Sequence, residues 1–154
     1  MPMSETASTS NTTALVGRQP IYGADVNVFA YELLYRGGEL LNQANFSDGD
    51  SATANVMLNT MLEIGLEQIV GNRLAFINMT TNLILDRLCE TLPKDQVVLE
   101  VLENVEPTEE IIDALTDLSR KGYTIALDDF IYHESLQPLV AIANIVKVDI
   151  MALS

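Results

Sequence analysis

The chain has 154 residues, of which 48% are hydrophobic and 19% are charged, a balance typical of one ordered globular domain. Its 8 basic and 22 acidic residues give a net charge of −14, which argues against binding to nucleic acid polymers or anionic membranes. A single cysteine excludes a disulfide within the chain, and no apolar run approaches the ~20 residues of a membrane span. We therefore expect a cytoplasmic protein.

Residues 1–13 are polar and rich in Ser and Thr, and we predict that they form a flexible tail ahead of one domain over 14–154. From Ala14 onward, apolar runs typical of strands alternate with helical patterns. The segment "GADV" is predicted to be a hairpin turn between the first two strands. The predicted strands cover 14–21, 27–35, 73–79, 96–102, 123–128 and 145–149.

The predicted helices cover 51–70, 82–91, 106–122 and 135–143. In the third of these, we expect Pro107 in the first turn and Gly122 at the end. Cys89 has leucine neighbours at helical spacing, which indicates a core position and not a nucleophile. The buried side of the first helix is expected to carry Val56, Met57, Met61, Leu62 and Ile69.

From residue 73 the strands are nearly continuous apolar runs, which favours a parallel sheet buried on both faces. Such a sheet is either an open doubly wound sheet or a (β/α)8 barrel. No glycine-rich phosphate loop follows the first strand, and this weakens the dinucleotide-binding alternative.

Polar residues interrupt successive strands near their carboxyl ends, where the active sites of parallel barrels are built. Any one of them could be a satisfied core polar group, but five strands with the same feature favour a functional site. The residues are Glu32, Asn78, Glu100, Asp128 with Asp129, and Lys147 with Asp149.

Converging carboxylates cannot all ionise without a cation nearby. Oxygen ligands fit one or two Mg²⁺ or Mn²⁺ ions better than Zn²⁺, and Lys147 would supply a second positive charge. Two such ions suit in-line attack of water on a phosphodiester, with Lys147 holding or polarising the water. The alternative for Lys147 is a buried salt bridge to Asp149 or Asp128.

Six short segments appear in an order that resembles the EAL domain, the bacterial cyclic di-GMP phosphodiesterase family: "QPI", "YELLYR", "FINM", "LEVLE", "ALDDF" and "VKVD". The wording of "GRQPIYGADVNVFAYELLYRGG" and "LPKDQVVLEVLENVEPT" is closer to the subgroup in which an HDOD domain follows the EAL domain. The resemblance runs from about residue 14 to residue 150.

The resemblance implies a (β/α)8 barrel of TIM type with one early antiparallel strand, and hydrolysis of cyclic di-GMP to pGpG with Mg²⁺ or Mn²⁺. By motif, the metal ligands are Glu32, Asn78, Glu100, Asp128 and its neighbour Asp129. The remaining matches are Arg36, which contacts substrate phosphate, Glu103, which steadies the loop after the aspartates, and Lys147, which lies near the attacking water.

The sequence departs from the family in three places. "ELL" replaces Glu-Ala-Leu but keeps the ligand Glu32. "FIYHES" replaces a Gly-Thr-Gly loop that couples metal binding to dimerisation in the family, in which the resemblance implies a homodimer through the EAL domain. His133 in this loop is expected to be exposed. The chain ends after six of the eight strands, so we expect a fragment that is inactive by itself.

Two alternatives to an enzyme remain open. The altered loop favours a degenerate EAL module that binds cyclic di-GMP or a protein partner without cleaving it. A third interpretation, less favoured by the motifs, is an unrelated open α/β binding domain with structural carboxylates.

Overall fold

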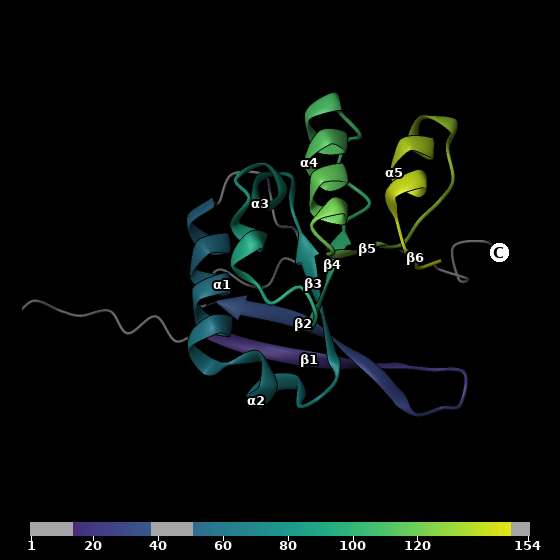
Figure 1. The fold of residues 1–154 in the computed structure, drawn as a ribbon. Coiled ribbons are helices and arrows are strands. Elements are labelled where there is room, and N and C mark those ends of the chain that lie inside the picture. The colour runs from purple at the N-terminus through teal and green to yellow at the C-terminus, as the bar shows by residue number, and fades with distance from the viewer. Residues whose placement is uncertain (1–13, 38–50, 149–154) are drawn as a thin grey trace, which may run out of the picture.

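A computed structural model describes residues 14–37 and 51–148, with side chains over 16–34 and 58–148. Six strands form one sheet in chain order (Figure 1). They are β1 (Ala14–Tyr22), β2 (Val28–Gly37), β3 (Leu74–Met79), β4 (Val97–Val101), β5 (Thr124–Leu127) and β6 (Ile145–Val146). The predicted tail, Asp149 and the end of the chain lie outside the described residues.

The first two strands form an antiparallel hairpin, and every later pairing in the sheet is parallel. The hairpin turn lies at the predicted "GADV" segment, where the Gly23 amide donates to the Asn27 carbonyl over 2.8 Å. The prediction of one mostly parallel sheet with an early antiparallel strand is therefore confirmed.

Helical segments connect the parallel strands and cover one face of the sheet (Figure 1). They are α1 (Ser51–Ile64), α2 (Leu66–Val70), α3 (Thr81–Leu85), η1 (Leu88–Thr91), α4 (Glu109–Arg120), η2 (Glu134–Leu136) and α5 (Gln137–Ile142). Across the two described ranges, the longest helix has 14 residues and none is long and apolar enough to cross a bilayer.

The two faces of the sheet have separate cores, because successive side chains along a strand point to opposite faces. The outer face packs against the helices in the larger core, to which Leu33, Ile77 and Leu99 belong. The inner face carries a smaller apolar cluster of Ala30, Phe76, Val98 and Ala126. Two positions further along each strand, the inner face becomes polar, and this change creates the candidate site.

The sheet is curved like part of a barrel. Three strands separate β2 from β6, so a flat sheet would hold these strands about 19 Å apart at the usual spacing of about 4.8 Å. Yet Lys147, just after β6, places its Nζ 3.3 Å from Glu32 Oε2 on β2. Only a sheet that curls around its inner face permits this contact, as the TIM-type barrel prediction requires.

Two predicted helices are broken by residues with positive φ. The helix expected over 51–70 divides into α1 and α2 at Gly65, which has φ 86°. Leu62, expected on the buried side, is 41% exposed, whereas Met61 is fully buried. The helix expected over 82–91 divides at Arg87, which adopts φ 57° ahead of η1. Sequence periodicity carries no sign of the second break because Arg87 is not a glycine.

The predicted helix over 106–122 is confirmed, apart from its first turn. Thr108 caps α4 by accepting a hydrogen bond from the Ile111 amide over 3.3 Å, so Pro107 lies before the cap and not inside the helix. Gly122, with φ 96°, ends the helix as expected. There the Tyr123 amide donates to the Leu118 carbonyl over 3.1 Å, closing the last turn.

The remaining differences are small. The helix expected over 135–143 consists of η2 followed by α5, and the strand expected over 145–149 is assigned only to Ile145–Val146. Cys89 is fully buried as predicted, and burial raises the pKa of its thiol to about 11.

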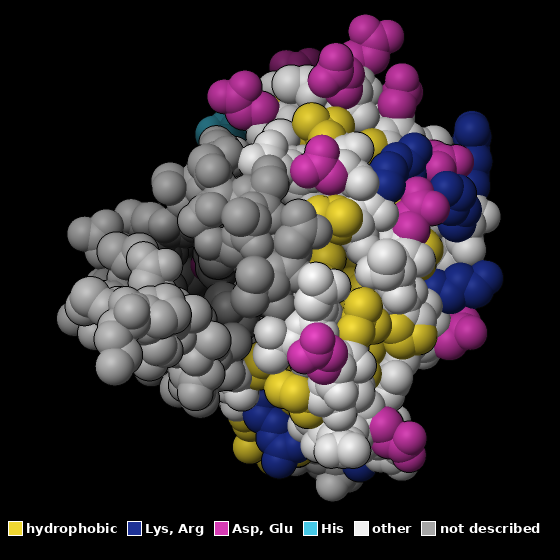
Figure 2. All heavy atoms as spheres, turned by 90° about the vertical axis from the view of Figure 1, so that its left-hand side faces the viewer, with side chains coloured by type: hydrophobic (Ala, Val, Ile, Leu, Met, Phe, Trp, Pro, Cys, Tyr) yellow, Lys and Arg dark blue, Asp and Glu magenta, His cyan; other side chains and the backbone are white. Residues whose placement is uncertain are grey.

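Acidic side chains are spread over the face seen in Figure 2, and basic ones lie along its right edge and at its lower end. A charged network joins the α3–η1 segment to α4: Arg87 pairs with Asp117 at 2.9 Å, and Lys121 pairs with Glu90 at 2.9 Å. These side chains are about one third to one half exposed, so the network adds little to stability and mainly fixes the register of the two helices.

Candidate functional site

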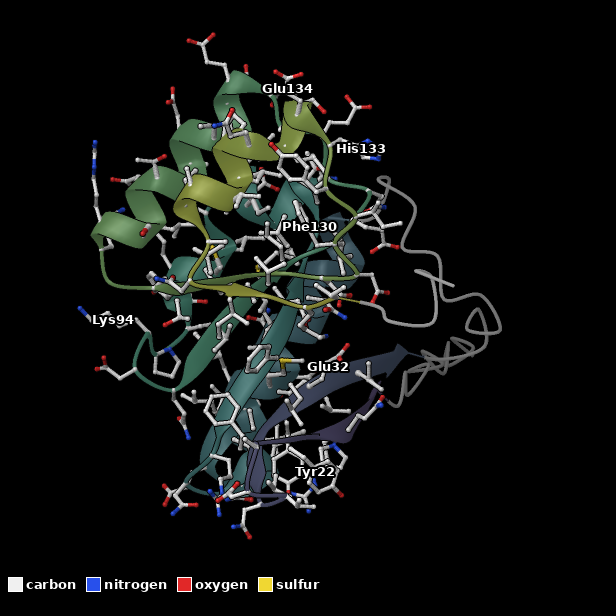
Figure 3. The ribbon with its side chains drawn as sticks, turned by 90° about the vertical axis from the view of Figure 1, so that its right-hand side faces the viewer. Tyr22, Glu32, Lys94, Phe130, His133 and Glu134 are labelled. Carbon is white, nitrogen blue, oxygen red and sulfur yellow. The ribbon has the colours of Figure 1, made fainter. Side chains whose placement is uncertain are left out.

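The inner face of the sheet carries a polar layer at the carboxyl ends of the strands. Glu32 lies on β2, Asn78 on β3 and Glu100 on β4, while Asp128 follows β5 and Lys147 follows β6. Asn78 and Glu100 are opposite each other in the β3–β4 register. Figure 3 shows Glu32 above Tyr22, which lies near the hairpin turn, and below Phe130 and His133 of the loop after β5.

Lys147 stands at the centre of three carboxylates. Its Nζ lies 3.3 Å from Glu32 Oε2 and 2.9 Å from Asp128 Oδ1, and it also donates to Glu100 Oε1. Burial disfavours the charged form of Lys147, but the hydrogen bonds to Glu100 and Asp128 outweigh it and raise its pKa above the ordinary value. The ion pair to Asp128, one of the two alternatives for Lys147, is therefore present.

Glu100 is the charged residue of the core. Its side chain is fully buried, and its pKa is raised to about 7 chiefly because burial penalises the carboxylate. The hydrogen bond from Lys147 opposes this shift, while the negative charges of Asp128 and Glu32 add to it. The Glu100 carboxyl is therefore held close to the balance between its charged and neutral forms.

Two buried acceptor oxygens in this layer have no hydrogen-bond partner among the described residues: Glu100 Oε2 and Asn78 Oδ1. Unsatisfied buried acceptors are rare in folded proteins and call for an explanation. A hard cation with oxygen ligands would satisfy both, and their placement on adjacent strands suits a shared ion. The residues present therefore fit a Mg²⁺ or Mn²⁺ ion.

A second acidic group lies at the outer rim of the layer. One carboxylate oxygen from each of Glu103, Asp128 and Asp129 lies within 4.8 Å of the others. Asp129 has φ 43°, a left-handed conformation that turns the chain sharply away from β5. The loop is held by the Phe130 amide, which donates to the Lys147 carbonyl over 2.9 Å. Glu103 thus lies beside Asp128 and Asp129. This position is compatible with its predicted role of steadying the loop that follows them.

Two other residues named from the sequence are Arg36 and His133. The backbone of Arg36 belongs to β2, four residues after Glu32, but its side chain lies outside the described part of the structure. His133 is exposed, as expected, and points away from the carboxylates at the outside of the loop (Figure 3).

The sequence did not reveal a small hollow of about 20 Å³ beside the acidic rim. Phe130 and Leu127 line it together with Glu103 and Asp128. It has room for a water molecule and not for a nucleotide.

No family model matches the chain. It is similar to a Vibrio cholerae protein named cyclic di-GMP phosphodiesterase CdgJ, with 38% identity over 141 residues that cover 92% of this chain and 33% of that protein. An uncharacterized Bacillus subtilis protein, YuxH, is 36% identical over 88% of this chain and 34% of its own length. The chain thus spans about one third of the length of these curated relatives.

Solved structures give the same fold. The Bacillus subtilis YkuI protein, described as having an EAL domain and in complex with c-di-GMP and calcium, superposes with a TM-score of 0.64 at 24% identity. The match covers 91% of this chain and 42% of that one. The EAL domain of Mycobacterium smegmatis DcpA gives a TM-score of 0.61 at 24% identity, covering 89% of this chain and 66% of that one.

Proposed function

This chain has the fold of an EAL domain, and on that premise we propose that the complete protein hydrolyses cyclic di-GMP to linear pGpG in a metal-dependent reaction. The observation that carries the proposal is the pair of unsatisfied buried oxygens, Glu100 Oε2 and Asn78 Oδ1, within a group of carboxylates. The name of the relative CdgJ and the c-di-GMP bound to YkuI support the choice of substrate.

The metal would be one or two Mg²⁺ or Mn²⁺ ions. Oxygen-only ligands favour these ions, and the acidic rim offers further carboxylates for a second ion. A bound ion lowers the pKa of a water molecule and neutralises charge that develops on the phosphate. The proposed ligands are Glu32, Asn78, Glu100, Asp128 and Asp129.

The other residues of the site would orient the reactants. Lys147 would donate a hydrogen bond to the attacking water, and the contact of its ammonium with Asp128 in the layer supports this role. Arg36 would contact a substrate phosphate from the end of β2. Glu103 would keep the loop after Asp129 in place, so that the two aspartates stay oriented towards the reaction.

Further features of the complete protein follow from the sequence resemblance alone. We propose that an HDOD domain follows the EAL domain, and that the protein acts in the cytoplasm on a small dinucleotide and not on nucleic acid or membranes. The net charge of −14 supports the last point. A homodimer through the EAL domain is a weaker proposal because "FIYHES" replaces the family's loop.

A sensor that binds cyclic di-GMP without cleaving it is the second candidate. The observation that favours it is the same loop: residues 130–135, where the family usually has a Gly-Thr-Gly segment, carry two exposed apolar side chains, Ile131 and Tyr132. In that case the carboxylate layer would hold a ligand, with or without an ion, but would not activate water.

The test is chromatographic detection of pGpG from the complete protein with Mg²⁺, with Mn²⁺ and with a chelator. We expect product with either ion and none with the chelator. Glu32→Ala should lower turnover by about 100-fold or more, since it removes a ligand. Glu63→Ala, at an exposed glutamate of α1, is the matched control and should leave turnover unchanged.

Binding of cyclic di-GMP without product under either metal would replace the enzyme by the sensor. The six strands of the described residues form a sheet with two open edges, β1 and β6, and not a closed barrel. We therefore also expect that the 154-residue chain by itself does not hydrolyse the dinucleotide.

A further inference from the structure

We propose that the Lys147 ammonium is a built-in counter-cation that competes with the divalent ion for the carboxylates of Glu32, Glu100 and Asp128. The inference rests on the proposed metal-dependent function and concerns how the site is kept assembled before the ion binds. It makes Lys147 a positioning residue in the metal-free protein, in addition to its proposed place beside the water.

The geometry matches the donors of Lys147 to the acceptors around it. An ammonium group has three protons, and three carboxylates from three different strands accept from it. One of these carboxylates, Glu100, is fully buried. Without a positive charge among them the three groups would repel one another or take up protons. Lys147 therefore holds the carboxyl ends of β2, β4 and β5 together.

A divalent ion cannot join this arrangement without disturbing it. Such an ion binds oxygens at about 2.0–2.2 Å, so an ion on Asp128 and Glu100 would lie close to an ammonium that contacts both. Two cations at such short range repel strongly in a partly buried site. Entry of the ion should therefore break or lengthen at least one of the three ion pairs of Lys147.

The structure also indicates how the divalent ion would begin to replace the Lys147 ammonium. Glu100 Oε2 and Asn78 Oδ1 are not engaged by Lys147, so an incoming ion has two ligands before the lysine moves. The Lys147 side chain is 30% exposed, which gives it a path towards solvent. The ion would first bind the two free oxygens and then displace the ammonium from the shared carboxylates.

The test is a calorimetric titration of the metal-free complete protein with Mn²⁺. Lys147→Met keeps most of the side chain and removes the charge, so we expect the Kd for Mn²⁺ to fall by about tenfold or more. The same variant should melt at a lower temperature in chelator. Lys147→Arg retains the charge and should keep the wild-type Kd within about threefold. Lys94→Met, an exposed lysine, is the control and should not change the Kd.

The outcomes separate the two proposals. If the wild-type protein binds no Mn²⁺, the metal site fails, and this inference fails with it. If the wild-type protein binds Mn²⁺ but Lys147→Met has an equal or higher Kd, only the competition is overturned.

A second measurement needs no variant and covers the case in which Lys147→Met does not fold. The wild-type protein is treated with an amine-acetylating reagent in chelator and in saturating Mg²⁺, and the modification of Lys147 and Lys94 is compared by mass spectrometry. Displacement predicts a rise of about fivefold at Lys147 with Mg²⁺, because its ion pairs no longer protect it. Equal modification of Lys147 in both conditions would overturn the inference.

Discussion

Replacement of Glu100 by Gln should change the pH dependence of stability in the metal-free protein. Burial raises the pKa of the Glu100 carboxyl to about 7 in the folded state, from the ordinary 4.5 of the unfolded chain. The folded protein therefore binds one more proton than the unfolded chain between these values. This extra proton raises the free energy of unfolding, and its contribution is fully present below pH 4.5. The contribution is lost as the pH rises through about 7.

The magnitude follows from the shift. Each pKa unit corresponds to about 1.4 kcal/mol, so the full contribution of the carboxyl is about 3 kcal/mol, of which about 2 kcal/mol is lost between pH 5 and pH 7. Glu100→Gln has no proton to lose in this range. The difference in unfolding free energy between wild type and variant should therefore move by about 2 kcal/mol in favour of the variant as the pH rises.

Urea denaturation followed by circular dichroism, at pH 5, 6 and 7 in chelator, measures this difference. The subtraction cancels the titration of groups that do not interact with residue 100. A difference that stays constant within about 0.5 kcal/mol over this range would show that the Glu100 carboxyl has an ordinary pKa. The claim that burial destabilises the charged form of Glu100 would then be wrong.

Two further predictions concern turns and caps. Val26→Gly should raise the free energy of unfolding by about 1 kcal/mol, because Val26 is 78% exposed at φ 62°, where a branched side chain is strained and glycine is not. Urea denaturation checks it, and a loss of stability would mean that the side chain makes a useful contact. Thr108→Ala should lower stability by about 1 kcal/mol, because the Ile111 amide loses its cap. Thr108→Ser should restore most of it, and an Ala variant as stable as wild type would exclude a role for the cap.

The sheet and its polar layer were predictable because both depend on a local rule. Side chains alternate between the two faces of a strand. Polar side chains at equivalent positions near the carboxyl ends of adjacent parallel strands therefore lie next to one another on the same face of the sheet. Glu32, Asn78, Glu100 and Asp128 each obey this rule. Their roles as ligands remain predictions, and so does the domain boundary at residue 14.

Other features depend on conformations and distances that a sequence pattern does not encode. The break at Arg87 needs a positive φ in a residue that usually avoids it, so the helical periodicity over 82–91 was misleading. The ion pair between Lys147 and Glu32 reaches across three intervening strands, and it exists only because the sheet curves. Sequence reasoning placed a cation in the layer but could not say that Lys147 would contact three carboxylates at once.

The most direct test of the metal centre is anomalous diffraction from a crystal of the protein grown or soaked with Mn²⁺. The account predicts a strong peak at about 2.2 Å from Glu100 Oε2 and from Asn78 Oδ1, with Lys147 moved off at least one carboxylate. A structure with Mn²⁺ in the crystal but no peak among these oxygens, and with Lys147 still bound to all three carboxylates, would contradict it.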